Sequence, residues 1–120
     1  MDYIVLMRII KKNKLHDFFR EHRQGTAPLL RWYEVAKKAH WKKFADVRET
    51  FPSADAVPVE SGRTAVVFNI KQNDYRLITA VHYERTVRDG SAERLLKGKI
   101  FLFFFLTHAE YDKQIWKSVL

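Results

Sequence analysis

The side chains best suited to chemistry follow one apolar stretch near the C-terminus. Residues 100–106 form an unbroken apolar run that contains four phenylalanines. A run of this length bounded by polar residues is typical of a strand buried on both faces, and a short buried helix gives the same pattern. Thr107 and Glu110 have the spacing of a capping box, so we expect a helix to begin near Thr107. His108, Glu110 and Tyr111 therefore collect where a core strand meets a helix, and the functional site is predicted at this junction.

A second polar set is predicted on two neighbouring strands. Alternation places Asn69 and Lys71 on one face of the first strand. It likewise places Arg76 and His82 on one face of the second strand. If the two faces coincide, these four side chains share a surface that ends near His108. The alternative interpretation is that each of them is an ordinary exposed strand residue.

These residue types suit RNA cleavage without a metal ion. The reaction needs a base that takes the 2′-hydroxyl proton, cations that stabilise the developing phosphorane charge, and an acid that protonates the leaving 5′ oxygen. His108 or His82 can exchange protons near neutral pH. Arg76 can hold the scissile phosphate with its fork of donors, and Lys71 can do so as a point charge.

Two tyrosines can assist this reaction, whereas a metal site fits the pattern less well. Tyr111 or Tyr75 can stack on an unpaired base or donate a proton. The series His108, Glu110 and Asp112 lacks the paired histidines of zinc proteases, and on a helix its side chains point in different directions. We therefore expect neither a metal nor another cofactor. The remaining histidines fall in helical or terminal positions and are predicted to lie on the surface: His16, His22 and His40.

Composition narrows the class of partner and the compartment. The formal net charge is +8, so nucleic acid or an acidic protein is the expected partner, although a solvated basic helix face would give the same count. Cysteine is absent, which excludes disulfides, thiolate metal sites and a cysteine nucleophile. No apolar stretch approaches the roughly 18 residues that cross a bilayer, and residues 3–7 are too short for a secretory signal. We expect a cytoplasmic protein without a membrane partner.

Helices are predicted mainly in the first half of the chain. Apolar side chains recur at helical spacing over residues 12–22. Thr26 is predicted to cap a second helix that tolerates Pro28 in its first turn and runs to about His40. A short third helical turn is predicted over residues 44–51.

The second half of the chain is predicted to be mostly strands. Residues 71–74 form a turn, residues 85–98 a long exposed loop, and a terminal helix runs to about Val119. The order predicts one α+β domain, residues 1–120, in which an N-terminal strand and two to three helices pack on one face of a small, mostly antiparallel sheet, with a further helix at the C-terminus. The predicted strands are residues 3–10, 57–59 (an edge piece), 63–70, 75–83 and 100–106.

Strict alternation divides the phenylalanine-rich strand into two apolar faces. One face contains Phe101, Phe103 and Phe105. Helices cover only one face of the predicted sheet, so the other is expected to meet nucleic acid, a partner chain or the loop 85–98. The opposite face contains Ile100, Leu102, Phe104 and Leu106.

Three segments together resemble one known family. They are WYEVAKKAHWKKFADVRETFPSAD at 32–55, VVFNIKQNDYRLITAVHY at 66–83 and THAEYDK at 107–113. The chain is similar to the HigB toxins of type II toxin–antitoxin systems, which have a RelE-like fold and act as mRNA endonucleases. The resemblance implies ribosome-associated cleavage of translated mRNA, inhibition of translation and growth, and neutralisation by a helix-turn-helix antitoxin of the HigA kind.

The resemblance and the chemistry together give the expected site. The predicted catalytic residues are Lys71, Arg76, His108 and Tyr111. Substrate binding is predicted for Asn69, Asn73, Tyr75, His82, Glu110 and Lys113.

Two of the departures from the family pattern bear on function. The loop 85–98 is longer than the usual connection, and Phe103 stands where members commonly carry a basic residue. Phe103 therefore supports an alternative, a weakly active or inactive relative that binds RNA, ribosome or antitoxin without cutting. A third interpretation is an interaction protein whose phenylalanine-rich strand pairs with a partner.

Overall fold

A computed structural model describes residues 7–10 and 13–120. Within this part of the chain, five α-helices fall into an early group of three and a late pair. A short 3-10 helix, η1 (Arg23–Gly25), leads into the second helix of the early group. The α-helices are α1 (Lys14–Glu21), α2 (Thr26–Ala36), α3 (Phe44–Thr50), α4 (His108–Asp112) and α5 (Trp116–Val119).

The strands form one five-stranded sheet and a separate two-stranded hairpin. In the sheet the order is β1-β7-β4-β3-β2, with β1 parallel to β7 and the other neighbours antiparallel. The predicted α+β class, the mostly antiparallel sheet and the edge position of β2 are confirmed. The strands are β1 (Arg8–Ile10), β2 (Asp55–Pro58), β3 (Thr64–Ile70), β4 (Tyr75–His82), β5 (Arg85–Asp89), β6 (Ala92–Leu96) and β7 (Lys99–Thr107).

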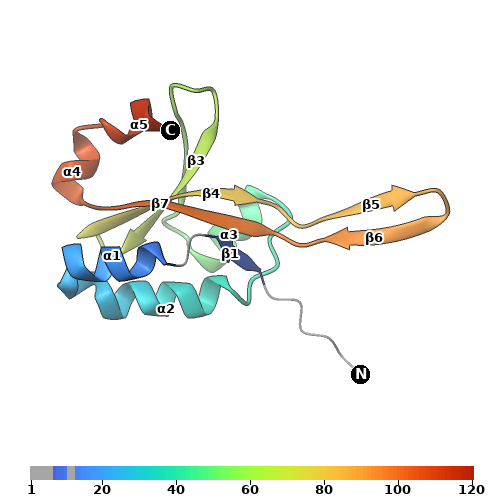
Figure 1. The fold of residues 1–120 in the computed structure, drawn as a ribbon, viewed down its shortest axis with the longest axis horizontal. Helices are drawn as coiled ribbons and strands as arrows, with labels where there is room; N and C mark the ends of the chain where they lie inside the picture. Colours follow the sequence, from blue (N-terminus) through green and yellow to red (C-terminus); the bar gives the residue numbers. More distant parts are fainter. Residues whose placement is uncertain (1–6, 11–12) are drawn as a thin grey trace.

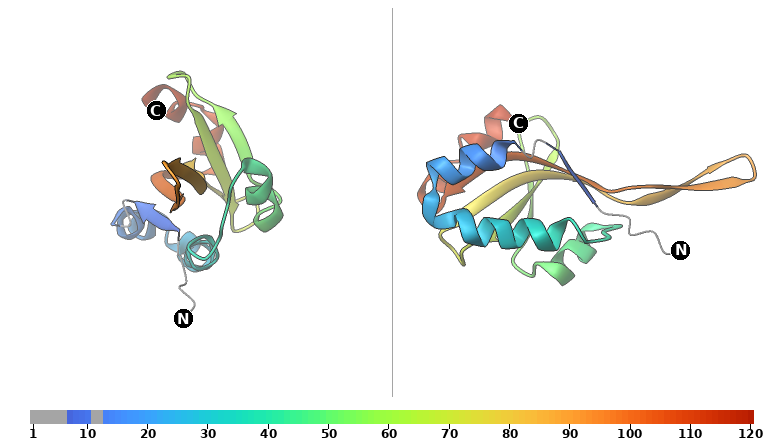
Figure 2. Two further views of the ribbon diagram at one scale, coloured as in Figure 1. Left: turned by 90° about the vertical axis from the view of Figure 1, so that its right-hand side faces the viewer. Right: turned by 60° about the horizontal axis from the view of Figure 1, so that its bottom comes forward.

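The larger core lies between the sheet and the early helices (Figure 1). Leu29, Trp32 and Ala36 recur at helical spacing and form the buried stripe of α2. The Trp32 ring packs on Phe68 of β3, with ring centroids 5.2 Å apart. Figure 2 shows α1 and α2 side by side along this face of the sheet. The predicted helical layer is therefore confirmed.

The C-terminal segment covers part of the opposite face. Trp116 of α5 is buried against Val67 and Ile78, together with Val59 and Ala65. The chain thus supplies its own cover for part of a face that was expected to meet nucleic acid, a partner chain or the loop 85–98. The C-terminal segment turns back over the sheet after β7, so the loop 85–98 is not the cover of this part of the face. Gln114, between α4 and α5, has a φ of 61°, so the predicted single terminal helix is two short ones.

A β-bulge in β7 changes which phenylalanines face which core. Ile78 pairs with Phe104 while Thr79 pairs with Leu102, so Phe103 is the extra residue. As a result Phe105 joins the helix-side core, whereas Phe104 packs with the opposite cluster. The strict alternation predicted for this strand is wrong for that reason. On the helix side, the Lys14 amine donates to the Phe103 carbonyl over 3.2 Å.

Three boundaries differ from the predictions. The second helix ends at Ala36 rather than near His40, and the Lys37 carbonyl instead accepts a hydrogen bond from the Met7 amide beside β1. Gly25, not Thr26, is its N-cap, because η1 runs directly into the helix. The first strand is present at Arg8–Ile10, and the part of its prediction before residue 7 lies outside the described residues.

The segment predicted as a loop over 85–98 is a β-hairpin. Residue pairs run from Arg85 with Leu96 to Asp89 with Ala92, around a turn at Gly90 with a φ of 64°. The hairpin projects from the body of the molecule as an extended ribbon (Figure 1). Its side chains are exposed on both faces apart from Val87 and Leu96, which are half-buried. Because no face is buried, its strands lack the apolar alternation that predicts a strand.

Candidate functional site

The two predicted polar sets, apart from His82, come together at one end of the sheet. The turn between β3 and β4 lies beside the start of α4, and the His108 amide donates to the Asp74 carbonyl over 3.1 Å. Tyr75, the first residue of β4, pairs with Thr107, the last residue of β7. An open groove of about 520 Å³ lies here, lined by Gln24, Asn73, Asp74, Tyr75, Thr107, His108 and Ala109.

Arg76 is the buried cation behind this groove. Its side chain lies on the same face as Asn69, because the two residues are directly paired across β3 and β4. The two strand faces, whose coincidence the sequence left open, therefore coincide at this pair. The guanidinium donates to the Asn73 carbonyl over 3.0 Å, the Tyr75 carbonyl over 3.2 Å and the Asn73 side-chain oxygen over 3.3 Å. Arg76 is 9% exposed, so it fixes the turn and places a positive charge directly behind it.

Tyr111 lies between Arg76 and Trp116. The Arg76 guanidinium carbon is 5.5 Å from the centre of the Tyr111 ring, and Trp116 stacks on that ring at 5.3 Å. Partial burial is the largest cause that raises the pKa of the Tyr111 phenol; Asp55 raises the pKa further, and Arg76 acts against the rise. The phenol therefore keeps its proton at neutral pH and can donate it.

His108 is the first residue of α4 and lines the groove. Its Nδ1 atom is 3.1 Å from a carboxylate oxygen of Asp112, one helical turn later, and its side chain is 52% exposed. When the ring is neutral, an Nδ1–H held by Asp112 leaves Nε2 as the acceptor for a substrate proton. Tyr111, three residues on, lies on the same side of the helix.

Glu110 is engaged in the N-cap of α4. Its carboxylate accepts from the Thr107 amide over 2.9 Å, while the Thr107 hydroxyl accepts from the Glu110 amide over 3.2 Å. The predicted capping box is therefore present. The Thr107 backbone hydrogen bond is the main cause that lowers the pKa of Glu110, and His22 and Lys113 contribute smaller effects of the same sign.

His22 is a residue of the site that the sequence did not indicate. Its side chain is 17% exposed, and its Nε2 atom lies 3.4 Å from Glu110. The ring also packs on Tyr75 at 5.2 Å and on Phe105 at 5.7 Å. The prediction of a surface histidine is wrong because η1 turns the chain back over these rings. A Cβ on Gly25 would lie 2.8 Å from the Phe105 ring, so this glycine is the one sequence signal of the close approach.

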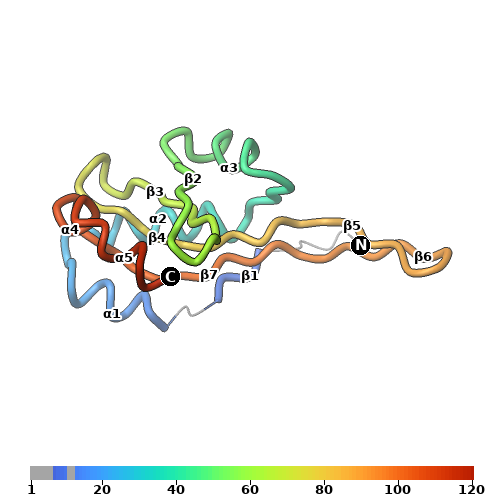
Figure 3. Tube along the Cα trace, turned by 90° about the horizontal axis from the view of Figure 1, so that it is seen from above, coloured from blue at the N-terminus to red at the C-terminus, as the bar shows by residue number. Residues whose placement is uncertain are grey.

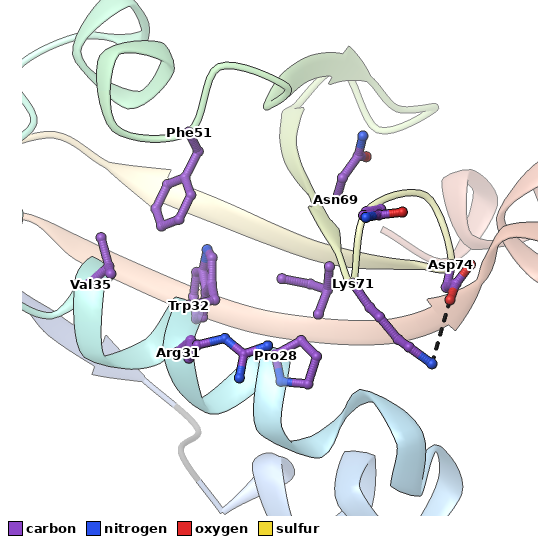
Figure 4. A pocket seen from close by; sticks show the side chains of 10 residues that line it. Pro28, Arg31, Trp32, Val35, Phe51, Asn69, Lys71 and Asp74 are labelled. Atoms are coloured by element: carbon purple, nitrogen blue, oxygen red, sulfur yellow. Dashed lines mark ion pairs between the residues drawn. The ribbon is translucent and has the colours of Figure 1, made fainter.

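Lys71 and Asn69 line a neighbouring groove of about 540 Å³ between α2 and the turn (Figure 4). Lys71 and Gln72 have φ values of 53° and 57°, which reverse the chain tightly at the end of β3. The Lys71 amine lies 3.6 Å from Asp74, and Asp74 lines both grooves. Lys71 thus belongs to the turn, but it lines the groove on the other side of the turn from His108.

Two other predicted residues lie at the margins. His82 shares a strand face with Arg76 but is six residues further along β4, about 20 Å away at about 3.3 Å per residue. Its ring packs on Phe101, with centroids 5.1 Å apart. The structure therefore does not bring His82 into the cluster. Lys113 is exposed at the C-cap of α4.

Three further observations concern metal sites, membrane spans and relatives. Among the residues described, no group of three or more histidine, aspartate or glutamate side chains is placed to hold a metal ion. No described helix is long and apolar enough to cross a membrane. No curated protein matches the chain.

A family model does match, and it covers both walls of the groove. Residues 25–114 match the HigB_toxin family, the RelE-like toxic component of a toxin–antitoxin system. The match runs from the start of α2 to the segment after α4, and the mixed sheet with its helical layer agrees with a RelE-like fold. An antitoxin is the partner that such a system implies. The chain therefore belongs to the HigB family of RelE-like toxins.

Proposed function

We propose that this toxin is a metal-independent endoribonuclease that cleaves mRNA on the ribosome and thereby inhibits translation and growth. The observation that carries the proposal is the convergence of His108, Tyr111 and Arg76 at one end of the sheet. This set provides a proton acceptor, a proton donor and a fixed positive charge, which are the three requirements for cleaving RNA without a metal.

In the proposed reaction the 2′-oxygen of the message attacks the adjacent phosphorus. His108 takes the 2′-hydroxyl proton on Nε2 while Asp112 holds Nδ1. The bond between phosphorus and the 5′ oxygen breaks, and Tyr111 gives its proton to that oxygen. The products are a 2′,3′-cyclic phosphate and a free 5′-hydroxyl. Arg76 stabilises the added negative charge in one of two ways. It acts at a distance from behind the turn, or it gives up its hydrogen bond to the Asn73 side chain and donates to a phosphate oxygen instead.

The groove provides the binding contacts for the substrate in this proposal. Tyr75 is half-buried and stacked on Phe105 at 5.0 Å, so its ring is held rigidly for contact with an unpaired base. Asn73 offers polar groups at the groove wall, while Lys71 and Asn69 contact the phosphate chain on the other side of the turn. Glu110 acts through the cap of α4. Lys113 is a phosphate contact at the outer margin.

Mapping message ends on translating ribosomes tests the proposal. Purified toxin is added to a reconstituted translation reaction, and 5′ ends are mapped by primer extension against a His108→Ala control. We expect new ends within the translated message, with 5′-hydroxyl termini, that are absent from the control. Intact message in the presence of toxin, in a reaction where an active relative cuts, would contradict the proposal.

A HigA-like helix-turn-helix antitoxin is the proposed neutralising partner. Co-expression of such a protein from the adjacent gene should relieve growth arrest and form a stable complex with the toxin. Continued growth arrest in spite of a stable complex would show that the complex leaves the active groove accessible.

A second candidate function is RNA or ribosome binding without cleavage, and Phe103 is the observation that favours it. Its side chain lines a hollow with Ala65 and Leu120 instead of adding a cation to the site. Phe103→Arg should raise the cleavage rate if a missing cation limits activity. An unchanged rate, with unchanged unfolding midpoint, would show that the present chain already has the charge it needs.

A further inference from the structure

A second groove lies at the other end of β4 and β7, where the β5–β6 hairpin leaves the sheet. Its volume is about 730 Å³. Cations from four distant segments converge on it, from β1, from the loop before α3, from the start of β5 and from the junction of β6 and β7. The lining residues are Arg8, Lys42, Val81, His82, Tyr83, Glu84, Arg85, Leu96, Lys97 and Lys99.

The charge of this groove is almost entirely positive. Its five basic side chains are all exposed, and none of them forms an ion pair with a residue in the described part of the chain. Glu84 is the one acidic lining residue. Its carboxylate is 11% exposed and lies 3.0 Å from Nδ1 of His40. The groove therefore presents five cations against one carboxylate, and a polyanion is its natural ligand.

The hairpin extends this surface away from the body of the molecule (Figure 3). The radius of gyration is 15.3 Å, whereas a compact domain of this length is expected at about 14 Å. The ribbon contributes no residue to either buried cluster. The hairpin adds two arginines to this surface, Arg94 and Arg88, and Arg88 is paired with Glu93 at 2.6 Å. A projecting two-stranded ribbon without a buried face is at best marginally stable alone, and its side chains are accessible to a ligand on both faces.

We propose that this basic end, defined as the second groove together with the β5–β6 hairpin, binds the phosphate backbone of RNA. The proposal rests on the proposed function for the class of ligand. Protein interfaces are anchored by exposed apolar or aromatic side chains, and among the large apolar residues exposed in the described chain only Leu95 lies here. Arginines and lysines without an apolar anchor match phosphate contacts, which give affinity without sequence preference.

The basic end and the proposed cleavage groove lie at opposite ends of the same strands. They are separated by about 20 Å along β4 at about 3.3 Å per residue. One RNA can therefore contact both, with the basic end holding its backbone while the reactive linkage lies beside His108. The bound segment is either single-stranded message or an adjoining RNA helix, and these share the same phosphate chemistry.

Binding measured as a function of salt tests this inference. In a His108→Ala background, which prevents cutting, Arg85, Lys97 and Lys99 are each changed to Gln. Affinity is measured by fluorescence anisotropy with a single-stranded RNA oligonucleotide and with an A-form RNA hairpin. The slope of log affinity against log salt is negative, and it should become less steep by about 0.7 to 0.9 for each phosphate that is no longer neutralised. For the three substitutions together the expected change is about 2 to 3. The probe whose slope falls in this way identifies the source of the backbone.

A charge-matched control separates a local surface from net charge. Arg20→Gln, Lys38→Gln and Arg63→Gln remove three exposed cations that line neither groove. We expect the slope to change by less than half as much in this control. An equal change in both triple variants, or no change in the first, would overturn the inference. So would loss of antitoxin binding with unaltered RNA binding, because the basic end would then be a protein interface.

A second variant keeps the test valid if the triple substitution disturbs folding. Replacing residues 87–94 by Asn-Gly shortens the hairpin while keeping Arg85, Leu96 and Lys97. The replaced segment contains Asp89 and Glu93 as well as Arg88 and Arg94, and Arg88 already pairs with Glu93. Loss of the phosphate contact of Arg94 should therefore lower the salt slope by about 1. The inference and the proposed function fail separately. Intact message with salt-dependent binding at the basic end contradicts cleavage alone, whereas cleavage with unaltered slopes contradicts the basic end alone.

Discussion

At the scale of single residues, the proposed proton transfer depends on a neutral Tyr111 phenol. Tyr111→Phe removes the O–H but keeps a ring between Arg76 and Trp116. We expect the cleavage rate to fall about 10²- to 10⁴-fold, the usual contribution of a general acid. RNA affinity and the unfolding midpoint should change little. Single-turnover cleavage together with chemical denaturation measures both effects, and Tyr75→Phe is the matched control.

The pH profile distinguishes this role from a structural one. Partial burial raises the pKa of Tyr111, so the rate should stay level to above about pH 10. Because the pKa of Tyr111 is raised in the folded chain, the phenol ionises at a lower pH in the unfolded chain. The stability that Tyr111 contributes is therefore present below the unfolded-state pKa and is lost as pH rises through the folded-state pKa. A fall in rate at mildly alkaline pH that persists in Tyr111→Phe would contradict the assignment.

Residue patterns predicted the strand face of this site but not its extent along the sheet. Alternation correctly grouped Arg76 with His82 within β4, because it depends only on the pleat, whereas the register that pairs Asn69 with Arg76 had to come from the structure. It could not show that His82 lies at the far end of β4, since position along a strand does not change the face. It also missed His22, whose place beside Tyr75 depends on a turn around Gly25.

At the scale of elements, α4 is the support for both proton-transfer residues. The helix has only five residues, so its N-cap contributes a large part of its order. Thr107→Ala removes the hydroxyl that accepts from Glu110 and should lower the free energy of unfolding by about 1 kcal/mol. Cleavage should fall as well, because His108 and Tyr111 lose their fixed positions. Thr107→Ser keeps the acceptor and should restore both quantities in urea unfolding and cleavage assays.

The cap also gives a pH dependence at the acid end. The Thr107 backbone hydrogen bond lowers the pKa of Glu110 in the folded state. Its contribution to stability is therefore complete above the ordinary glutamate pKa and is lost as pH falls through the lowered value. Glu110→Gln retains an acceptor for the Thr107 amide, so this variant should show a smaller loss of stability on acidification. An identical acid transition in wild type and variant would count against the cap as its cause.

Elements with a buried face were predicted well, and the others were not. The strands β3, β4 and β7 and the helix α3 lie within one residue of their predicted bounds, because each presents apolar residues to a core. The hairpin of β5 and β6 was missed since it buries neither face. The bulge at Phe103 was missed for another reason: a continuous apolar run leaves no polar residue to mark the change of face.

At the scale of the whole molecule, charge and chemistry are separated along the sheet. Arg76, Tyr111 and His108 lie at one end, and the cations around Lys99 lie at the other. Composition predicted a polyanionic partner from a net charge of +8 but could not place the charge. Placement depends on the pairing of β1 with β7, which brings Arg8 opposite Lys99 although these residues are far apart in the sequence.

The separation predicts that salt changes RNA capture more than the chemical step. If three to five phosphates are held, the KM for a single-stranded RNA should rise about 20- to 100-fold from about 50 to about 200 mM salt. The kcat should stay nearly constant, because Arg76 is held by the turn and does not depend on free ions around the groove. Steady-state cleavage of a short RNA across this range measures both constants. A kcat that falls in step with the rise in KM would mean that the exposed cations act in the transition state, and that the two ends of the sheet form one functional surface.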